Sequence, residues 1–167
     1  DDSEVDGFEM NLFQELNMLP APFDGLFISM NFTKTKGTSS LAVDSGTVSF
    51  PFRKLSEDNA NISIGYDKNK FDIRLSRVSR SPYLDYLADD DSETIQEDLD
   101  NNNIRYTDHH DQLDFNLKYK INNQMSLKFD ISNITDEPEF YYWGTPDRLS
   151  QYDLYGRTYS IGIRYNL

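Results

Sequence analysis

The chain has 167 residues, and its 29 acidic and 16 basic side chains give a formal net charge of −13, which argues against a nucleic-acid partner because phosphate-binding surfaces need clustered Lys and Arg. Cysteine is absent, which excludes disulfides and thiol chemistry, and no run of about 18 apolar residues provides a transmembrane helix. The mean hydropathy of −0.69 is typical of a soluble or disordered chain, whereas the 14% aromatic content is not.

Apolar and polar residues alternate along most of the chain, and this period of two predicts β-strands. Leu113, Phe115 and Leu117, for example, alternate with Asp114 and Asn116. Seven antiparallel strands, each paired with its neighbour in sequence, are predicted near residues 7–19, 25–35, 59–67, 70–79, 110–121, 124–134 and 155–167.

The predicted connections alternate between short and long. The segments "PAPFDG", "DKNK" and "NNQ" are short, whereas the three other connections are polar stretches of about 20 to 30 residues. This asymmetry is typical of bacterial outer-membrane barrels, which have short periplasmic turns and long extracellular loops. Each strand carries about ten patterned residues, which is enough for a tilted strand to cross the hydrocarbon layer. The fold class predicted is therefore all-β, as part of a transmembrane antiparallel β-barrel.

In such a barrel the apolar face of each strand meets lipid and the polar face meets a wet lumen. Low overall hydropathy is then expected, because every strand is half polar and the loops carry charge. The lipid-facing set predicted here is Phe8, Leu12, Ile28, Phe32, Ile64, Ile73, Phe115, Leu117, Leu127, Phe129, Ile161 and Ile163.

Four segments resemble the late barrel strands of TonB-dependent outer-membrane receptors: "GFEMNLFQELNMLPAPFDGLFISMNFTKT", "NANISIGYDKNKFDIRLSRVSRSPYLDYL", "LKYKINNQMSLKFDISNITDEPEFYYWG" and "YDLYGRTYSIGIRYNL". The run "NITDEP" is also similar to the Asn-Leu-(Phe/Thr)-Asp segment that ends the penultimate strand in that family. The resemblance implies that residues 1–167 are the C-terminal part of a 22-stranded barrel whose plug domain and earlier strands are absent.

The resemblance further implies a place in the cell outer membrane of a Gram-negative bacterium. The function implied is active transport of a scarce nutrient, a siderophore, a carbohydrate or a similar compound, and the sequence does not identify it. The partners implied are membrane lipid, the plug and remaining strands, the TonB complex through the missing N-terminal part, and the barrel-assembly machinery. The terminal strand looks like the signal that this machinery reads, with Tyr159, Ile161, Ile163, Tyr165 and Leu167, although Phe is commoner than Leu at the last position.

The sequence offers no catalytic constellation, no cofactor motif and no metal-ligand spacing, so no enzymatic activity is expected. His109 and His110 are the only histidines, and adjacent residues of an extended chain point apart. An acidic run could gather Ca²⁺, but its spacing fits no EF-hand and runs of like charge are usually solvated. That run comprises Asp89, Asp90, Asp91, Glu93, Glu97, Asp98 and Asp100.

The segment 139–152, "EFYYWGTPDRLSQY", is the candidate ligand-binding loop, because aromatic rings stack on sugars and macrocycles. Tyr141, Tyr142, Trp143 and Arg148 are its candidate contacts. Aromatic residues beside a membrane boundary also form the interfacial girdle of barrels, so girdle and loop packing is one alternative, and contact with a partner protein is the other.

Inward-facing charged residues are expected to pair with one another or with the plug: Arg74, Lys118, Lys128, Asp130 and Arg164. The alternative function is a soluble, secreted antiparallel β module that binds glycans. The apolar face that runs through all seven predicted strands distinguishes the two, because a soluble sandwich must bury that face against a second sheet.

Overall fold

The computed structural model describes residues 2–43, 46–87 and 95–166, which form an all-β structure with two short helices. Neither described helix has the length and apolar character needed to span a membrane. In chain order the elements are β1 (Asp2–Glu15), η1 (Phe23–Gly25), β2 (Leu26–Val43), β3 (Gly46–Pro51), β4 (Asp58–Lys68), β5 (Phe71–Arg80), β6 (Tyr83–Leu87), α1 (Ile95–Asp100), β7 (Ile104–Thr107), β8 (His110–Lys120), β9 (Met125–Ser132), β10 (Glu139–Trp143), β11 (Leu149–Asp153) and β12 (Thr158–Tyr165).

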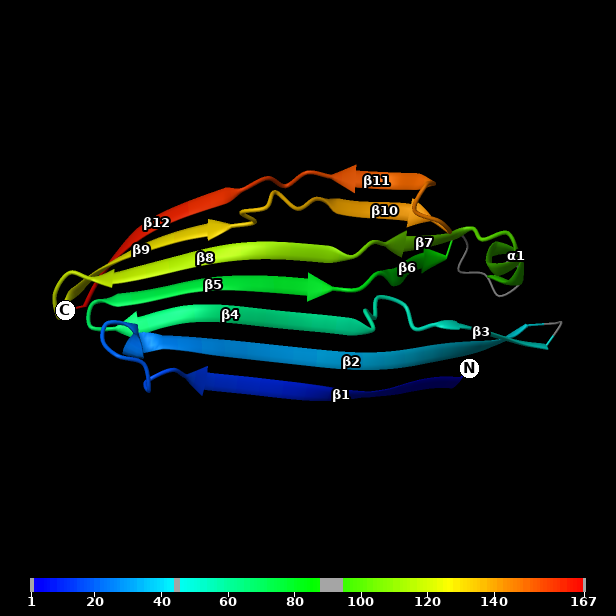
Figure 1. Cartoon of the computed structure of the whole chain (residues 1–167). Coiled ribbons are helices and arrows are strands. Elements are labelled where there is room, and N and C mark those ends of the chain that lie inside the picture. The colour runs from blue at the N-terminus through cyan, green and yellow to red at the C-terminus, as the bar shows by residue number, and fades with distance from the viewer. Residues whose placement is uncertain (1, 44–45, 88–94, 167) are drawn as a thin grey trace.

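The long sheet has the strand order β1-β2-β4-β5-β8-β9-β12, and β3 pairs with the outer part of β2. Every neighbouring pair on this path is antiparallel, so the seven predicted strands and their pairing are confirmed. The sheet is open, with β1 and β12 at its two edges, and it forms a single curved layer (Figure 1). The antiparallel all-β class is thus observed without closure into a barrel.

The strand boundaries differ most from those predicted at three places, the two ends of β1 and the end of β2. β1 begins at Asp2 and ends at Glu15, and β2 continues to Val43. The extra length is a ladder in which residues 2–6 of β1 pair with residues 36–40 of β2. Apart from Val5 these residues are polar or Gly, so apolar alternation could not signal a strand there.

The three short turns and the C-terminal end of β12 lie at one end of the sheet, and the N-terminus lies at the other (Figure 1). Local side-chain chemistry explains two of these turns. Asn69 has a positive φ of 58° between β4 and β5, a conformation that Asn tolerates better than most residues. The side chain of Asn122 accepts hydrogen bonds from the backbone N–H groups of Gln124 and Met125 at 2.9 and 2.8 Å.

A second sheet, with the order β11-β10-β7-β6, lies at the opposite end, where long loops were predicted. We call it the upper sheet. Its strands continue β12, β9, β8 and β5 beyond the long sheet, and α1 lies beside them (Figure 1). The prediction of irregular loops was therefore wrong for 83–87, 95–100, 104–107, 139–143 and 149–153. The physical reason is a small core, formed by Leu84, Leu87, Ile95 and Ile104.

Candidate functional site: an amphipathic sheet and an aromatic upper layer

The strand register gathers the apolar side chains on one face of the long sheet. Residues directly opposite one another in an antiparallel pair project to the same side. One row crosses six strands, with Leu26, Tyr66, Ile73, Leu117, Phe129 and Ile161 in turn. All twelve residues predicted to be lipid-facing lie on this face, which we call the apolar band.

Nothing covers the apolar band among the described residues. None of its twelve predicted members is buried; Ile64 is 55% exposed and Ile161 is 76% exposed. The buried apolar side chains lie elsewhere, mainly in the upper sheet. A continuous apolar surface over seven strands far exceeds the patches that soluble monomers present to water.

Ion pairs border the apolar band at both ends. Towards the upper sheet, Lys34 Nζ lies 2.8 Å from Asp58 Oδ1, and Arg77 Nε donates to Asp111 Oδ1 at 2.6 Å. At the short-turn end, Lys68 pairs with Asp24 of η1. The hydrogen bond from Lys68 lowers the pKa of Asp24 from its usual value.

The distance between these borders suits a membrane. Asp58 and Lys68 are the first and last residues of β4, and residues 60–66 of the band lie between them. Ten residue steps of about 3.4 Å give about 34 Å along the strand. With the tilt of about 35–45° found in membrane barrels, the height becomes about 24–28 Å, close to the ~25 Å apolar zone of such proteins.

The opposite face of the long sheet is polar and hydrogen-bonded. The hydroxyls of Ser63 and Ser76 are 2.8 Å apart, and Asn116 Nδ2 donates to Asp130 Oδ1 at 2.8 Å. Lys128 Nζ lies 2.9 Å from Asp130 Oδ2, so the pairing predicted for these two residues is confirmed.

The other predicted inward charges behave differently. The guanidinium of Arg74 lies 5.4 Å from the ring centre of Phe27, a cation–π contact rather than an ion pair. Phe27 is buried because its ring lies over Gly65, where a Cβ would come within 2.1 Å of Phe27 Cζ. Lys118 and Arg164 form no ion pair within the described part of the chain, so of the two expected partners only the absent plug is left for them, and that pairing stays a prediction.

The predicted ligand-binding residues lie on β10, in the middle of the upper sheet, and in the turn after it. Tyr142 is only 7% exposed, and its ring stacks on Tyr106 with centres 5.5 Å apart. Burial raises the pKa of both tyrosines, and the negative charge of Asp108 adds to the effect at Tyr142. Tyr142 therefore packs inside the protein and offers little surface to a ligand.

Tyr141 and Trp143 project from the opposite side of β10, because side chains alternate along a strand. Tyr141 donates a hydrogen bond to Glu139 Oε2 at 2.6 Å, which raises the pKa of its phenol, and Arg105 lies 4.5 Å above its ring. Trp143 packs edge-on against Tyr86 with ring centres 6.5 Å apart. This side of the upper sheet is the aromatic surface that remains available to a ligand.

Arg148 does not join the aromatic surface directly. Its Nη1 donates to the backbone carbonyl of Asn102 at 3.1 Å, which ties the β10–β11 turn to the segment before β7. The sequence reasoning missed Tyr86 and Arg105, which belong to this surface. The short aromatic segments "SPYLDYL" and "NIRYT" contain these residues, but neither is long enough to show the alternation of apolar and polar residues that predicts a strand.

The predicted assembly residues lie on the edge strand β12. Tyr159, Ile161, Ile163 and Tyr165 all lie on the apolar band and are exposed, whereas Leu167 lies outside the described residues. One edge of β12 pairs with β9, and its other edge has no partner strand in the described structure.

Metal binding has no geometric basis in the described ranges, where no group of three His, Asp or Glu side chains could hold an ion. Asp89, Asp90, Asp91 and Glu93 lie outside those ranges, so the idea of Ca²⁺ in the acidic run is not tested. Asp98 is buried and accepts a hydrogen bond from Asn103 at 3.1 Å. His109 is exposed with Nδ1 at 3.2 Å from Asp108, which is an ordinary surface contact.

Comparisons with known proteins return nothing: no family model, no curated protein and no solved structure matches this chain. The resemblance to TonB-dependent receptors therefore gains no support from them. The geometry of the two sheets is what remains to indicate a function.

Proposed function

We propose that this chain forms part of the wall of an outer-membrane β-barrel, as the C-terminal portion of a TonB-dependent receptor that imports a scarce nutrient. The observation that carries the proposal is the apolar band, which spans seven strands and is bordered at both ends by ion pairs. Lipid is the solvent that matches such a band, since each apolar side chain left in water forfeits its burial free energy.

The soluble alternative needs a second layer of structure. A sandwich or a helix-covered sheet buries its apolar face against other elements. Apart from η1 in the β1–β2 turn, the described elements beyond the long sheet form the upper sheet and α1, past the end of the band rather than on it (Figure 1). A secreted glycan-binding module is thus the weaker proposal.

Strand parity supports a barrel wall that other strands complete. The path from β1 to β12 contains seven antiparallel strands, so its two edge strands run in the same direction. Pairing β12 directly with β1 would make a parallel ladder, whereas bacterial barrels are antiparallel throughout and tolerate no open edge in lipid. An odd number of further strands restores antiparallel closure, and the 22-stranded architecture adds fifteen.

The aromatic surface of the upper sheet is the proposed contact for the imported compound. Long connections face outwards in these barrels, which places Tyr141, Trp143 and Tyr86 at the extracellular mouth. Flat aromatic rings stack on sugar rings and on aromatic chelators alike. A carbohydrate is the favoured cargo and a siderophore the second.

The proposal is tested by two adjacent substitutions on β8. Leu117 lies on the apolar band and Asn116 lies on the polar face, so Leu117→Arg and Asn116→Arg add the same charge to opposite sides. Near the membrane midplane Leu117→Arg should cost about 2–4 kcal/mol of unfolding free energy, and Asn116→Arg should cost much less. Unfolding by urea in lipid vesicles gives both values, and heat-modifiable gel migration reports whether a barrel forms. Equal costs for the two variants, or a neutral Leu117→Arg, would contradict contact between the band and lipid.

A further inference from the structure

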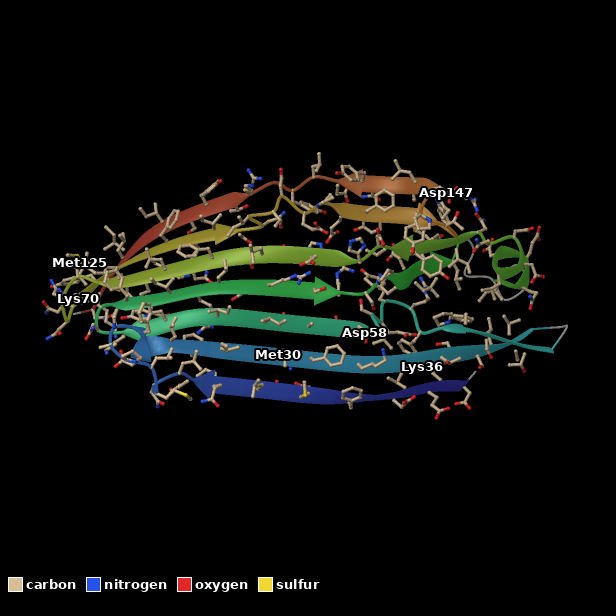
Figure 2. The ribbon with its side chains drawn as sticks, viewed as in Figure 1. Met30, Lys36, Asp58, Lys70, Met125 and Asp147 are labelled. Carbon is tan, nitrogen blue, oxygen red and sulfur yellow. The ribbon has the colours of Figure 1, made fainter. Side chains whose placement is uncertain are left out.

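Four cationic side chains gather at the short-turn end of the polar face. Lys70, Lys118, Lys120 and Arg164 line one hollow of about 490 Å³, together with polar side chains of the turns. Figure 2 labels Lys70 and Met125, two residues of this hollow, at that end of the sheet. No carboxylate lines it, although acidic residues outnumber basic ones by 29 to 16 in the chain.

Within the part of the chain that the structure describes, these four cations lack ion-pair partners, whereas Lys34, Lys68 and Arg77 at the borders of the apolar band each have one. None of the four makes an ion pair within the described residues. Lys70 Nζ donates a hydrogen bond to the carbonyl oxygen of Ile121 at 3.4 Å, and Arg164 Nε donates to the Oδ1 atom of Asn166 at 3.3 Å, so both bond to neutral oxygens. Asp72 lies opposite Lys118 in the β5–β8 register without pairing with it. The residues that line the hollow therefore give it a local excess of positive charge.

The register explains why a hollow forms between the cations. Lys120, Ser126 and Arg164 form one row across β8, β9 and β12, so two long cationic side chains flank a small hydroxyl. The next row contains Lys118, Lys128 and Gly162, and nothing lies within 4 Å of a Cβ placed at Gly162. The surface is therefore low at Gly162 on β12, and the longer cationic side chains of Lys118, Lys120 and Arg164 lie around it.

We propose that this hollow binds an acidic segment of a protein that approaches the polar face from the short-turn end. Lys118 and Lys120 are two residues apart on one face of β8, about 6.8 Å, which is also the spacing of alternate carboxylates in an extended peptide. Arg164 lies two strand spacings from Lys120, about 9.6 Å, and can meet a further carboxylate. The inference goes beyond the proposed transport role, and it stands whether or not the apolar band meets lipid.

Two other anionic partners fit less well. A lipid headgroup would meet the apolar side of the sheet, whereas Lys118, Lys120 and Arg164 project from the polar side. A nucleic acid would be repelled at long range by the net charge of −13. A short carboxylate-bearing segment, in contrast, fits a local positive hollow within a negative protein.

The test measures binding of a fluorescein-labelled Glu-Ser-Glu-Ser-Glu-Ser-Glu peptide to the full chain folded in detergent micelles, by fluorescence anisotropy at low salt. The site variant is Lys118→Gln, Lys120→Gln and Arg164→Gln together. The control variant is Lys36→Gln, Lys54→Gln and Arg148→Gln, which removes the same charge far from the hollow. Each exposed cation is expected to contribute about two- to fivefold in affinity, so the site variant should bind at least about tenfold more weakly and the control variant within about twofold of the unmodified chain.

The proposal fails if the unmodified chain does not bind the peptide, if both variants lose affinity equally, or if the matching Gln-Ser peptide binds as well. It also fails if inorganic phosphate binds with the same dependence on the three cations and the same affinity, because the site would then be a simple anion site. The single variants Lys118→Gln and Arg164→Gln, each expected to weaken binding about threefold, keep the test valid if the triple variant does not fold. Heat-modifiable migration is measured in parallel, so loss of membrane assembly is distinguished from loss of peptide binding.

Discussion

The upper sheet continues four strands of the long sheet, but the two sheets place their apolar side chains in opposite ways. The long sheet buries almost nothing of its own: its apolar band is uncovered and its other face is lined by hydrogen-bonded polar side chains. The upper sheet buries Leu84 and Leu87 to 1% exposure, with Ile95 and Ile104 packed on them. The long sheet has its apolar side chains on the outside, unlike a soluble protein, whereas the upper sheet has a small buried core like that of a soluble protein.

If the proposed membrane location is right, this contrast marks where the surroundings of the protein change from lipid to water. The ion pairs Lys34–Asp58 and Arg77–Asp111 lie at the transition between the two regions. In the long sheet the apolar side chains are exposed on the surface, and in the upper sheet they are buried in a core. An apolar core is favourable only where water surrounds it, and an apolar surface only where lipid does. The boundary therefore predicts which substitutions act on which region.

The largest effect is expected from removal of β12, which is the closing strand of the proposed barrel. Deleting residues 159–167 removes nearly all of β12, exposes the edge of β9 and removes four side chains of the apolar band. An open edge at the level of lipid leaves backbone groups unsatisfied, so folded protein in the outer membrane should be lost completely. Heat-modifiable migration on a gel measures this loss.

The matched control for that deletion is removal of α1, residues 95–100. It takes Ile95 out of the upper core but leaves every strand of the long sheet in place. Migration should persist in this control. Normal assembly and transport after deletion of 159–167 would show that β12 is not a closing strand.

The second prediction concerns the upper core. Leu84→Ala creates a cavity at a side chain that is 1% exposed, and should destabilise the upper sheet by about 2–5 kcal/mol. Trp143 is the only tryptophan and lies in the upper sheet, so its fluorescence follows unfolding of this region alone. Leu149→Ala, at a 59% exposed position of the same sheet, should change the fluorescence transition by less than about 0.5 kcal/mol. Simultaneous loss of the long sheet in Leu84→Ala would show that the two regions unfold as one.

The sequence predicted the long sheet because its strands alternate without interruption. The pattern from Leu26 to Phe32 or from Leu113 to Tyr119 needs no tertiary information to identify the two faces. The upper sheet escaped prediction because its strands have four or five residues, and register shifts follow Leu84 and Tyr141. A bulge interrupts the period of two on which the prediction depends.

The candidate ligand site shows a second feature that the sequence could not predict, namely which of its aromatic side chains are buried. Residues 140–143 are four consecutive aromatic residues, so alternation places two on each side of β10 but cannot say which side is buried. The answer depends on Tyr106, Leu41 and Phe50, which come from other elements and pack on or near the upper core. Sequence reasoning therefore located the aromatic cluster but could not separate Tyr142 from Tyr141 and Trp143.

A smaller effect is expected at the border between the two regions. Arg77→Gln breaks the ion pair between Arg77 and Asp111. The Arg77 side chain is 58% exposed, and exposed ion pairs contribute little, so the variant should lose only about 0.2–1 kcal/mol of unfolding free energy. Lys34→Gln at the neighbouring pair should behave alike. Urea unfolding in lipid vesicles measures both. A cost above about 3 kcal/mol would mean that the pair is desolvated, and that the apolar zone extends beyond the border inferred here.

The smallest effect is a pH dependence confined to the upper sheet. Burial raises the pKa of Tyr106 and Tyr142 above 10.0, the value expected in the unfolded chain. Above about pH 10 the unfolded tyrosines lose protons that the folded ones retain, so stability is constant below that pH and falls as the pH rises further. Trp143 fluorescence during urea unfolding at pH 9 and pH 11 should therefore show a less stable upper sheet at pH 11. Tyr142→Phe should reduce the difference, whereas Phe140→Leu, which alters a ring 6.2 Å from Tyr142 without removing a titrating group, should not. An unchanged difference in Tyr142→Phe would mean that the stacked pair is more open to water than its burial implies, and the upper sheet would then differ less from the long sheet than the core of Leu84 and Leu87 suggests.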